Sequence, residues 1–166
     1  MSKMLEDTFL AIELEASALR GGKKLFDRVG GRVTLEAVHK RFYDKIYAHN
    51  WIGQFFKGID QKHIESQQTD FIAMLFGGPK AYSGRMPIDA HEHIMIDDEL
   101  FALRTELLVQ SLKESGIGPV ETEDWLRIDG AFKKVLIKKS LSECKKRYFS
   151  DAILDFSNPS KNSRAS

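Results

Sequence analysis

The sequence contains a single cysteine, Cys144, among its 166 residues. One cysteine can form neither an internal disulfide nor a thiolate zinc site, so the fold depends on neither. No apolar stretch is long enough to cross a bilayer, and Glu13 and Glu15 interrupt the N-terminal apolar residues where a secretory signal needs a continuous run. These absences lead us to expect a cytoplasmic protein in a reducing compartment.

The sequence also lacks an excess of charge of one sign. Its 25 Lys and Arg residues and 24 Asp and Glu residues leave a net charge of +1. That balance excludes the global positive field that drives sequence-independent binding of nucleic acids, and we expect no nucleic-acid partner. With 42% apolar residues, 11 of the total being Phe, the chain can build a core that encloses a ligand. Its length fits one domain with short appendages.

Apolar residues recur at spacings of three and four, and no segment alternates with the period of two that a half-buried strand requires. The pattern therefore predicts an all-α fold. Glycines, prolines and capping residues divide it into helices. The predicted helices cover residues 4–20, about four turns after Gly31, the stretch between Asp60 and Gly77, a short helix starting at Pro87, the stretch from Asp97 to Gly116, and a long last helix from Pro119 to about Tyr148.

Histidines are the candidates for metal or acid–base chemistry. There are five: His39, His49, His63, His91 and His93. His91 shares a helical stripe with Ile88 and Ile94, so we expect its ring to face the interior. His93 follows two residues later and points about 200° away on a helix, so we expect it to be solvated.

An inward His91 facing helices that present Tyr43 and Gln68 supplies one strong metal ligand and two neutral hydrogen-bond donors. The set contains no acidic residue that would orient a catalytic triad, and no Ser nucleophile stands in a recognisable turn. It suits a planar iron cofactor that is held on one side by imidazole and binds a diatomic ligand on the other.

Residues 25 to about 137 resemble the truncated haemoglobins, and among them group I. The likeness rests on the order and spacing of short motifs rather than on any one of them. They are Leu25-Phe26 before Gly30-Gly31, then Phe42-Tyr43, Phe55-Phe56, Gln67-Gln68, Gly77-Gly78-Pro79 before Tyr82-Ser83-Gly84-Arg85, and Ala90-His91 with Ile96 five residues after the histidine.

This resemblance implies a two-over-two helical sandwich around haem b (iron protoporphyrin IX). His91 looks like the proximal iron ligand, and Tyr43 and Gln68 look like the distal pair that stabilises bound O2. Phe56 is similar to the aromatic residue that packs on the porphyrin, and Ile64 takes the place of the distal histidine of many globins. The other cofactor-binding residues implied are Phe42, Gln67, Phe71 and Ile96, with Arg85, Lys62 and Lys80 as candidate partners of the haem propionates.

The function implied is reversible binding of O2, and of NO and CO, at ferrous iron. Its role stays open between NO detoxification and O2 storage or transport, with gas sensing and peroxidase-like redox chemistry as alternatives. An NO dioxygenase activity would require an external reductase, because the sequence has no flavin or dinucleotide fingerprint.

Two alternatives of other classes remain at this stage. A di-iron carboxylate bundle is suggested by Glu36-x-x-His39 and imitated by Asp60-x-x-His63, although such sites use two Glu-x-x-His motifs and two further Glu. A helical interaction module without a cofactor is the second alternative.

Two segments lie outside the resemblance. Residues 1–24 are expected to form an N-terminal helical extension, and residues 138–166 a basic C-terminal helical extension that ends in a disordered tail. The simplest expectation is that both are solvated, with no membrane contact and a monomer or weak dimer. Docking of the tail on a membrane surface or on a second subunit is the alternative, offered by its apolar residues Leu141, Tyr148, Phe149, Ile153 and Leu154.

Overall fold

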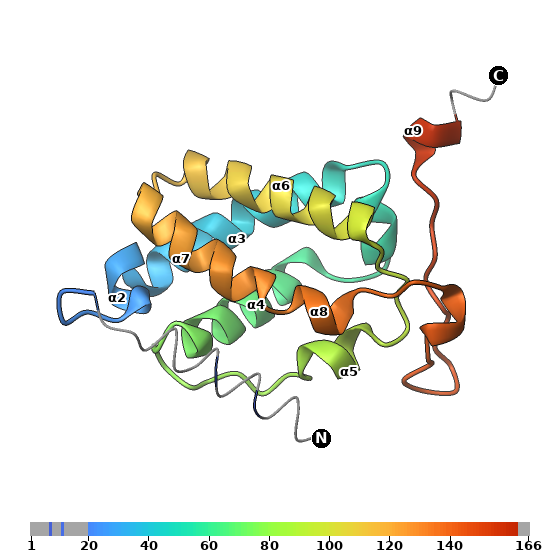
Figure 1. Ribbon diagram of the computed structural model, residues 1–166, viewed down its shortest axis with the longest axis horizontal. Helices are drawn as coiled ribbons and strands as arrows, with labels where there is room; N and C mark the ends of the chain where they lie inside the picture. The colour runs from blue at the N-terminus through green and yellow to red at the C-terminus, as the bar shows by residue number, and fades with distance from the viewer. Residues whose placement is uncertain (1–6, 8–10, 12–19, 163–166) are drawn as a thin grey trace.

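A computed structural model describes residue 7, residue 11 and residues 20–162 (Figure 1). Within them the chain is helical, and no strand longer than an isolated bridge forms. The helix predicted over residues 4–20 falls almost entirely outside these residues. The elements are α2 (Leu25–Val29), α3 (Gly31–Ala48), the 3-10 helix η1 (Ile52–Phe56), α4 (Gln61–Leu75), α5 (Pro87–His91), α6 (Asp98–Glu114), α7 (Pro119–Gly130), α8 (Lys133–Leu136), the 3-10 helix η2 (Leu141–Glu143) and α9 (Pro159–Asn162).

The four longer helices α3, α4, α6 and α7 make up the body of the fold (Figure 1): α3 contacts both α4 and α6, and an ion pair between Arg104 and Asp129 links α6 to α7. The short α5 packs against α8 at one end of this arrangement. The side chains that fill the centre, among them Phe42, Phe76, Leu112 and Trp125, are each no more than 2% exposed. This confirms the all-α fold and its two-over-two layout. None of the helices in the described ranges is long and apolar enough to cross a membrane.

The helix starts follow local capping chemistry. The Asp60 carboxylate accepts a hydrogen bond from the His63 backbone N–H at 2.8 Å, and the Asp97 carboxylate does the same for Leu100 at 2.8 Å. Each carboxylate satisfies a backbone donor that has no partner inside its helix. Pro87 and Pro119 stand in the first turns of α5 and α7, where a missing N–H has no cost. These predicted starts are confirmed.

The predicted long last helix is wrong. α7 ends at Gly130, and α8 ends at Leu136. Residues 137–158, which we call the C-terminal strap, form no helix or strand apart from η2 and an isolated bridge between Leu154 and Ile94. Ser140 and Glu143 form a capping box that begins a new turn, so the chain restarts there instead of continuing a helix.

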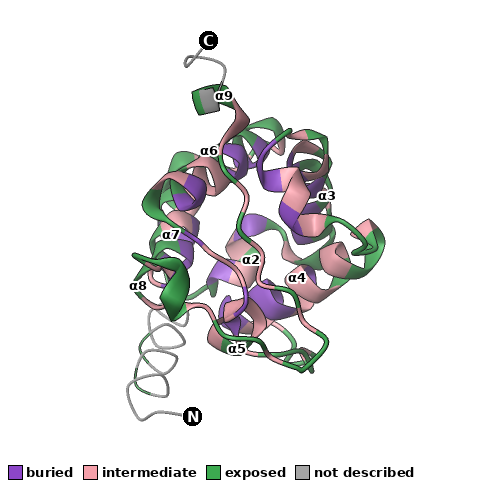
Figure 2. Cartoon of the chain, turned by 90° about the vertical axis from the view of Figure 1, so that its right-hand side faces the viewer, coloured by how far each residue is buried: buried purple, intermediate pink, exposed green. Residues whose placement is uncertain are grey.

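The strap also differs from the expected solvated extension, because it lies along the molecule. Figure 2 shows this part of the chain descending from α9 towards α5. Besides the turns it forms within itself, its backbone makes hydrogen bonds to residues 92–96, as in Leu154 N–H to the His93 carbonyl and Met95 N–H to the Leu154 carbonyl. At its far end the Trp51 indole N–H donates to the Phe156 carbonyl at 2.6 Å. Asn158, at the end of the strap, and Lys161 of α9 both donate hydrogen bonds to the Glu99 carboxylate of α6.

Candidate functional site

A cavity of about 320 Å³ lies between α3, α4, α5 and α6. Its walls are mostly apolar and aromatic, as in sites that hold an organic ligand. All ten residues predicted to bind the cofactor line it: Phe42, Tyr43, Phe56, Ile64, Gln67, Gln68, Phe71, Arg85, His91 and Ile96. Lys62 and Lys80, named beside Arg85 as propionate partners, are not among the residues described as lining it.

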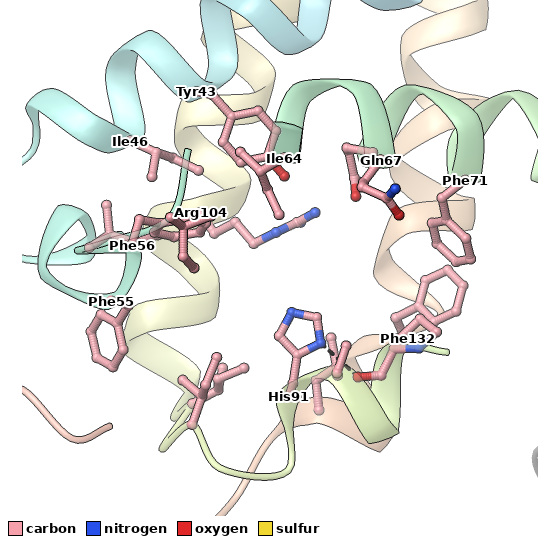
Figure 3. A pocket seen from close by; sticks show the side chains of 18 of the residues that line it. Tyr43, Ile46, Phe55, Phe56, Ile64, Gln67, Phe71, His91, Arg104 and Phe132 are labelled. Carbon is pink, nitrogen blue, oxygen red and sulfur yellow. Dashed lines mark hydrogen bonds between the residues drawn. The ribbon is translucent and has the colours of Figure 1, made fainter. Parts of the chain in front are cut away.

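His91 stands at the C-terminal end of α5, and its ring points into the cavity (Figure 3). The Nδ1 atom lies 2.6 Å from the Pro87 carbonyl oxygen. Since a carbonyl oxygen can only accept, Nδ1 carries the proton, and Nε2 is left with its lone pair. Burial lowers the pKa of the imidazole to about 4, so the ring is neutral at physiological pH. Metals bind the neutral form of imidazole, so the lone pair on Nε2 of His91 is available to a metal ion.

Tyr43 reaches the cavity from α3, on the side opposite His91 (Figure 3). Its ring packs edge-on against Phe42 and Phe56, with centroids 5.1 and 6.0 Å away. Burial raises the pKa of the phenol, so the hydroxyl keeps its proton. In the described part of the chain this hydroxyl bonds no other residue, which leaves the O–H available to a ligand in the cavity.

The third wall comes from α4, where Ile64, Gln67 and Gln68 line the cavity. Neither glutamine side chain hydrogen-bonds another described residue, so both amides are available as donors. Ile64 contributes only apolar surface between them and η1. The side of the cavity that faces His91 therefore carries one phenol and two amides, and no imidazole.

An ion pair that the sequence analysis missed also lines the cavity. Arg104 of α6 extends between Tyr43 and His91 (Figure 3), and its guanidinium pairs with the buried Asp129 of α7 at 2.8 Å. The sequence did hold a signal. Arg104 follows Leu100 by one helical turn, and Asp129 follows Trp125 by one turn, so each interrupts an inward apolar stripe with a charge of opposite sign.

His93 corrects another expectation. We expected it to be solvated, whereas it is 7% exposed and its Nδ1 is buried without a hydrogen-bond partner. Two consecutive features explain the difference. α5 ends at His91, so the helical angle between the two histidines does not apply, and the strap covers this segment.

Besides Arg104, two further arginines line the cavity, Arg85 and Arg147. Arg85 lies over the ring of Tyr148 at 4.5 Å and also donates to its hydroxyl. Arg147, from the strap, lines the cavity and is held by Asp151 at 2.8 Å. Arg85 thus lines the cavity together with Arg147, which the sequence did not suggest, and the pairing of Arg85 with a haem propionate stays a prediction.

The di-iron alternative is not supported. His39 is buried and its Nδ1 lies 2.7 Å from the Thr69 hydroxyl, whereas Glu36 is on the surface with Arg32. His63 is exposed. Among the described residues, no group of three or more His, Cys, Asp or Glu side chains could hold a metal ion. The His91 imidazole, pointing into a largely apolar cavity, fits haem instead, which brings the other iron ligands itself.

Comparison with known proteins agrees with this geometry. Residues 24–143 match the family described as bacterial-like globin. A group 1 truncated haemoglobin of Tetrahymena pyriformis is 36% identical over 93 residues, which cover 56% of this chain and 77% of that protein. One from Mycolicibacterium paratuberculosis is 32% identical over 98 residues, covering 59% and 71%.

Solved structures show the same fold. The Fe(III) form of the Tetrahymena pyriformis truncated haemoglobin has a TM-score of 0.66 and 30% identity, covering 70% of this chain and all of that one. A 2/2 haemoglobin of Synechococcus sp. PCC 7002, in the cyanomet state and with covalently attached haem, has a TM-score of 0.62 and 25% identity, covering 67% and 94%.

A helical sandwich around a cavity with one inward imidazole defines a globin, and the chain belongs to the bacterial-like globin family. Within that family its relatives identify it as a truncated haemoglobin of group 1. It is therefore a haem globin that binds small gas ligands reversibly.

Proposed function

We propose that His91 is the proximal ligand of a haem b and that Tyr43, with the α4 glutamines, is the distal donor set. In this proposal the protein binds O2, NO and CO and retains O2 tightly. One observation supports the proposal: His91 and Tyr43 face each other across the cavity. His91 presents a lone pair on Nε2, and Tyr43 presents an unbonded O–H from the other side.

Haem bound through His91 would supply a ferrous iron that takes up a gas, and the protein side chains would decide how each gas is held. The Pro87 carbonyl keeps the His91 ring in one plane and raises its basicity as a ligand. The Tyr43 O–H, in a site shielded from water, favours a gas that draws negative charge onto itself, such as O2, over uncharged CO. A hydrogen bond to a charged acceptor contributes about 1.5–3 kcal/mol, so one such bond slows O2 release about 10- to 100-fold.

Tight retention of O2 supports NO detoxification as the role. NO and O2 together take up one electron and form nitrate, so each turnover needs an electron from outside the globin. A separate reductase has to provide it. O2 storage or transport is the second candidate role, and it needs no electron donor.

The test of the ligand is His91→Ala, refolded with excess haem and compared with His63→Ala, which removes an exposed imidazole. We expect the His91 variant to lose most of its haem content and its ferrous spectrum, and the His63 variant to keep both. Unchanged haem content and spectrum in His91→Ala would overturn the assignment.

The test of the distal side is Tyr43→Phe, with Tyr47→Phe as control because the Tyr47 hydroxyl already donates to the Ile59 carbonyl at 2.8 Å. We expect O2 dissociation to become about 10- to 100-fold faster in the first variant and to stay the same in the second. Gln67→Leu and Gln68→Leu, measured in the same way, assign the amide that assists Tyr43. An O2 dissociation rate unaltered by Tyr43→Phe contradicts the proposal.

The test of the role is rapid mixing of the oxygenated protein with NO. Fast production of ferric protein and one equivalent of nitrate supports NO detoxification. Slow or absent nitrate production removes that role and leaves storage or transport.

A further inference from the structure

The segment that carries His91 is short of internal support. α5 has only five residues, and residues 92–96, which follow it, form no helix or strand. The last carbonyls of a helix have no partner inside it and need one from elsewhere. Of these, the His91 carbonyl receives the Ile94 N–H at 3.0 Å.

Lys138 supplies the second partner. Its ammonium group donates to the His91 carbonyl at 3.0 Å and to the Ile94 carbonyl at 2.8 Å, and its backbone N–H donates to the Ile96 carbonyl at 2.8 Å. A cation that bonds the last carbonyls of a helix also interacts favourably with the negative end of the helix dipole. One residue thus holds three carbonyls of the turn that begins at His91.

The rest of the strap continues the same pattern along this turn. The Lys145 N–H donates to the Glu92 carbonyl at 2.9 Å, and the Leu154 N–H donates to the His93 carbonyl at 2.9 Å. In return the Met95 N–H donates to the Leu154 carbonyl at 2.8 Å. Lys138 lies inside the range that matches the globin family, residues 24–143, whereas Lys145 and Leu154 lie outside it, so the three bonds that involve Lys145 and Leu154 come from outside the matched range.

We propose that Lys138 is a positioning residue for His91, and that the strap holds the proximal turn in the geometry that directs Nε2 into the cavity. The inference rests on the proposed role of His91 as the iron ligand. The physical reason is that His91 Nδ1 bonds the Pro87 carbonyl within the same single helical turn. If the end of that turn loosens, the ring loses its fixed plane. Outer contacts of this kind change metal affinity about 10- to 100-fold when they are removed.

The test compares Lys138→Met with Lys139→Met in the full chain. The two lysines are neighbours, but Lys139 is exposed and its ammonium group bonds no other described residue. We expect Lys138→Met to transfer its haem to an apo-globin acceptor about tenfold faster than the parent. Its ferrous iron–histidine stretching band should shift or broaden. Lys139→Met should match the parent in both measurements.

A second measurement uses the haem-free protein, so that it separates this proposal from the function it rests on. Amide hydrogen exchange of peptides covering residues 91–96 should be about tenfold faster in Lys138→Met, with exchange in α3 unchanged. Where Lys138→Met does not fold, Lys138→Gln, which keeps a shorter neutral donor, takes its place.

A parent protein that takes up no haem would overturn the proposed function, whereas the exchange experiment would still test the strap. Lys138 variants with the parental exchange rate, haem transfer rate and iron–histidine band would overturn the positioning role.

Discussion

Arg104 and Asp129 meet inside the cavity in a two-point ion pair, with Nη1–Oδ2 at 2.8 Å and Nη2–Oδ1 at 2.9 Å. The guanidinium also lies 5.4 Å from the ring centre of Phe42. Because the two charges cancel, the pair adds polarity to an apolar pocket without adding net charge. Both residues line the cavity, Arg104 from α6 and Asp129 from α7.

We predict that Asp129→Ala destabilises the protein by about 1.5–3 kcal/mol, because it leaves the partly buried Arg104 guanidinium without its charged partner. The double replacement Arg104→Leu with Asp129→Leu should cost much less, since it removes both desolvated charges together. Urea unfolding followed by circular dichroism measures the free energy of unfolding of each. A double variant as unstable as Asp129→Ala would contradict the explanation.

Two glycine substitutions, one in the turn after α4 and one at the end of α7, test how much space the fold leaves for a Cβ atom. A Cβ atom on Gly78 would lie 2.6 Å from the Phe26 ring, so Gly78→Ala should lower the free energy of unfolding by about 1–3 kcal/mol through overpacking. Gly130, at the end of α7, has no neighbouring atom within 4 Å of the same position. Gly130→Ala should therefore raise stability by about 0.5–1 kcal/mol. The two variants should shift the thermal midpoint in opposite directions, and a common direction would contradict this account.

His39 predicts an acid sensitivity of folding. Burial lowers the pKa of its imidazole from 6.5 to about 3, so the folded protein keeps the ring neutral while the unfolded chain takes up a proton below pH 6.5. The unfolded state binds more protons, so stability falls as the pH drops from about 6.5 towards 3, by about 1.4 kcal/mol per pH unit for this group. His91 adds the same effect down to a pKa of about 4.

The measurement is the free energy of unfolding at pH 7, 6 and 5 in the haem-free protein. His39→Gln keeps a hydrogen-bonding group near Thr69 and removes the titration. The free energy of unfolding of this variant should therefore fall less steeply with decreasing pH, as expected for the uptake of one proton fewer on unfolding. Equal slopes in the two proteins would show that His39 is not the source.

Asp124 provides a further contrast between buried and exposed charges. Its carboxylate is 2% exposed and receives hydrogen bonds from Arg20, Arg28 and Arg127. Asp124→Asn should destabilise the protein by about 3 kcal/mol or more, because Arg28 stays buried beside a neutral group. Asp98→Asn breaks only an exposed pair with Lys133 and should change stability by about 1 kcal/mol or less. Equal effects of the two substitutions in chemical unfolding would count against the burial argument.

Much of the fold could be predicted because its signals are local. Asp60 and Asp97 cap helices with their own side chains, and Pro87 and Pro119 occupy first turns, so the boundaries depend on a few neighbouring residues. The cavity residues could be named because their spacing resembles a known family. The ten residues predicted to bind the cofactor line the cavity, whereas Lys62 and Lys80 are not among the lining residues, and all roles towards haem remain predictions.

The strap could not be predicted in the same way. Leu141, Tyr148 and Leu154 are spaced as on an amphipathic helix, but the backbone of this segment finds its partners some 50 residues away in sequence, on residues 92–96. Periodicity reports only how apolar residues repeat and contains no information about such distant partners. The Arg104–Asp129 pair escaped for the same reason, since each charge is explained only by the other.

The order in which the chain is made gives the strap one more consequence. Synthesis proceeds from the N-terminus, so α3, α4 and α6 can pack while the residues that bond the His91 turn are still to be added. Lys138 and Leu154 follow α3, α4 and α6 in the chain, so the turn gains these partners only after those helices have been made. In a nascent chain the helices around the cavity can therefore pack before the turn that begins at His91 receives its contacts from the strap.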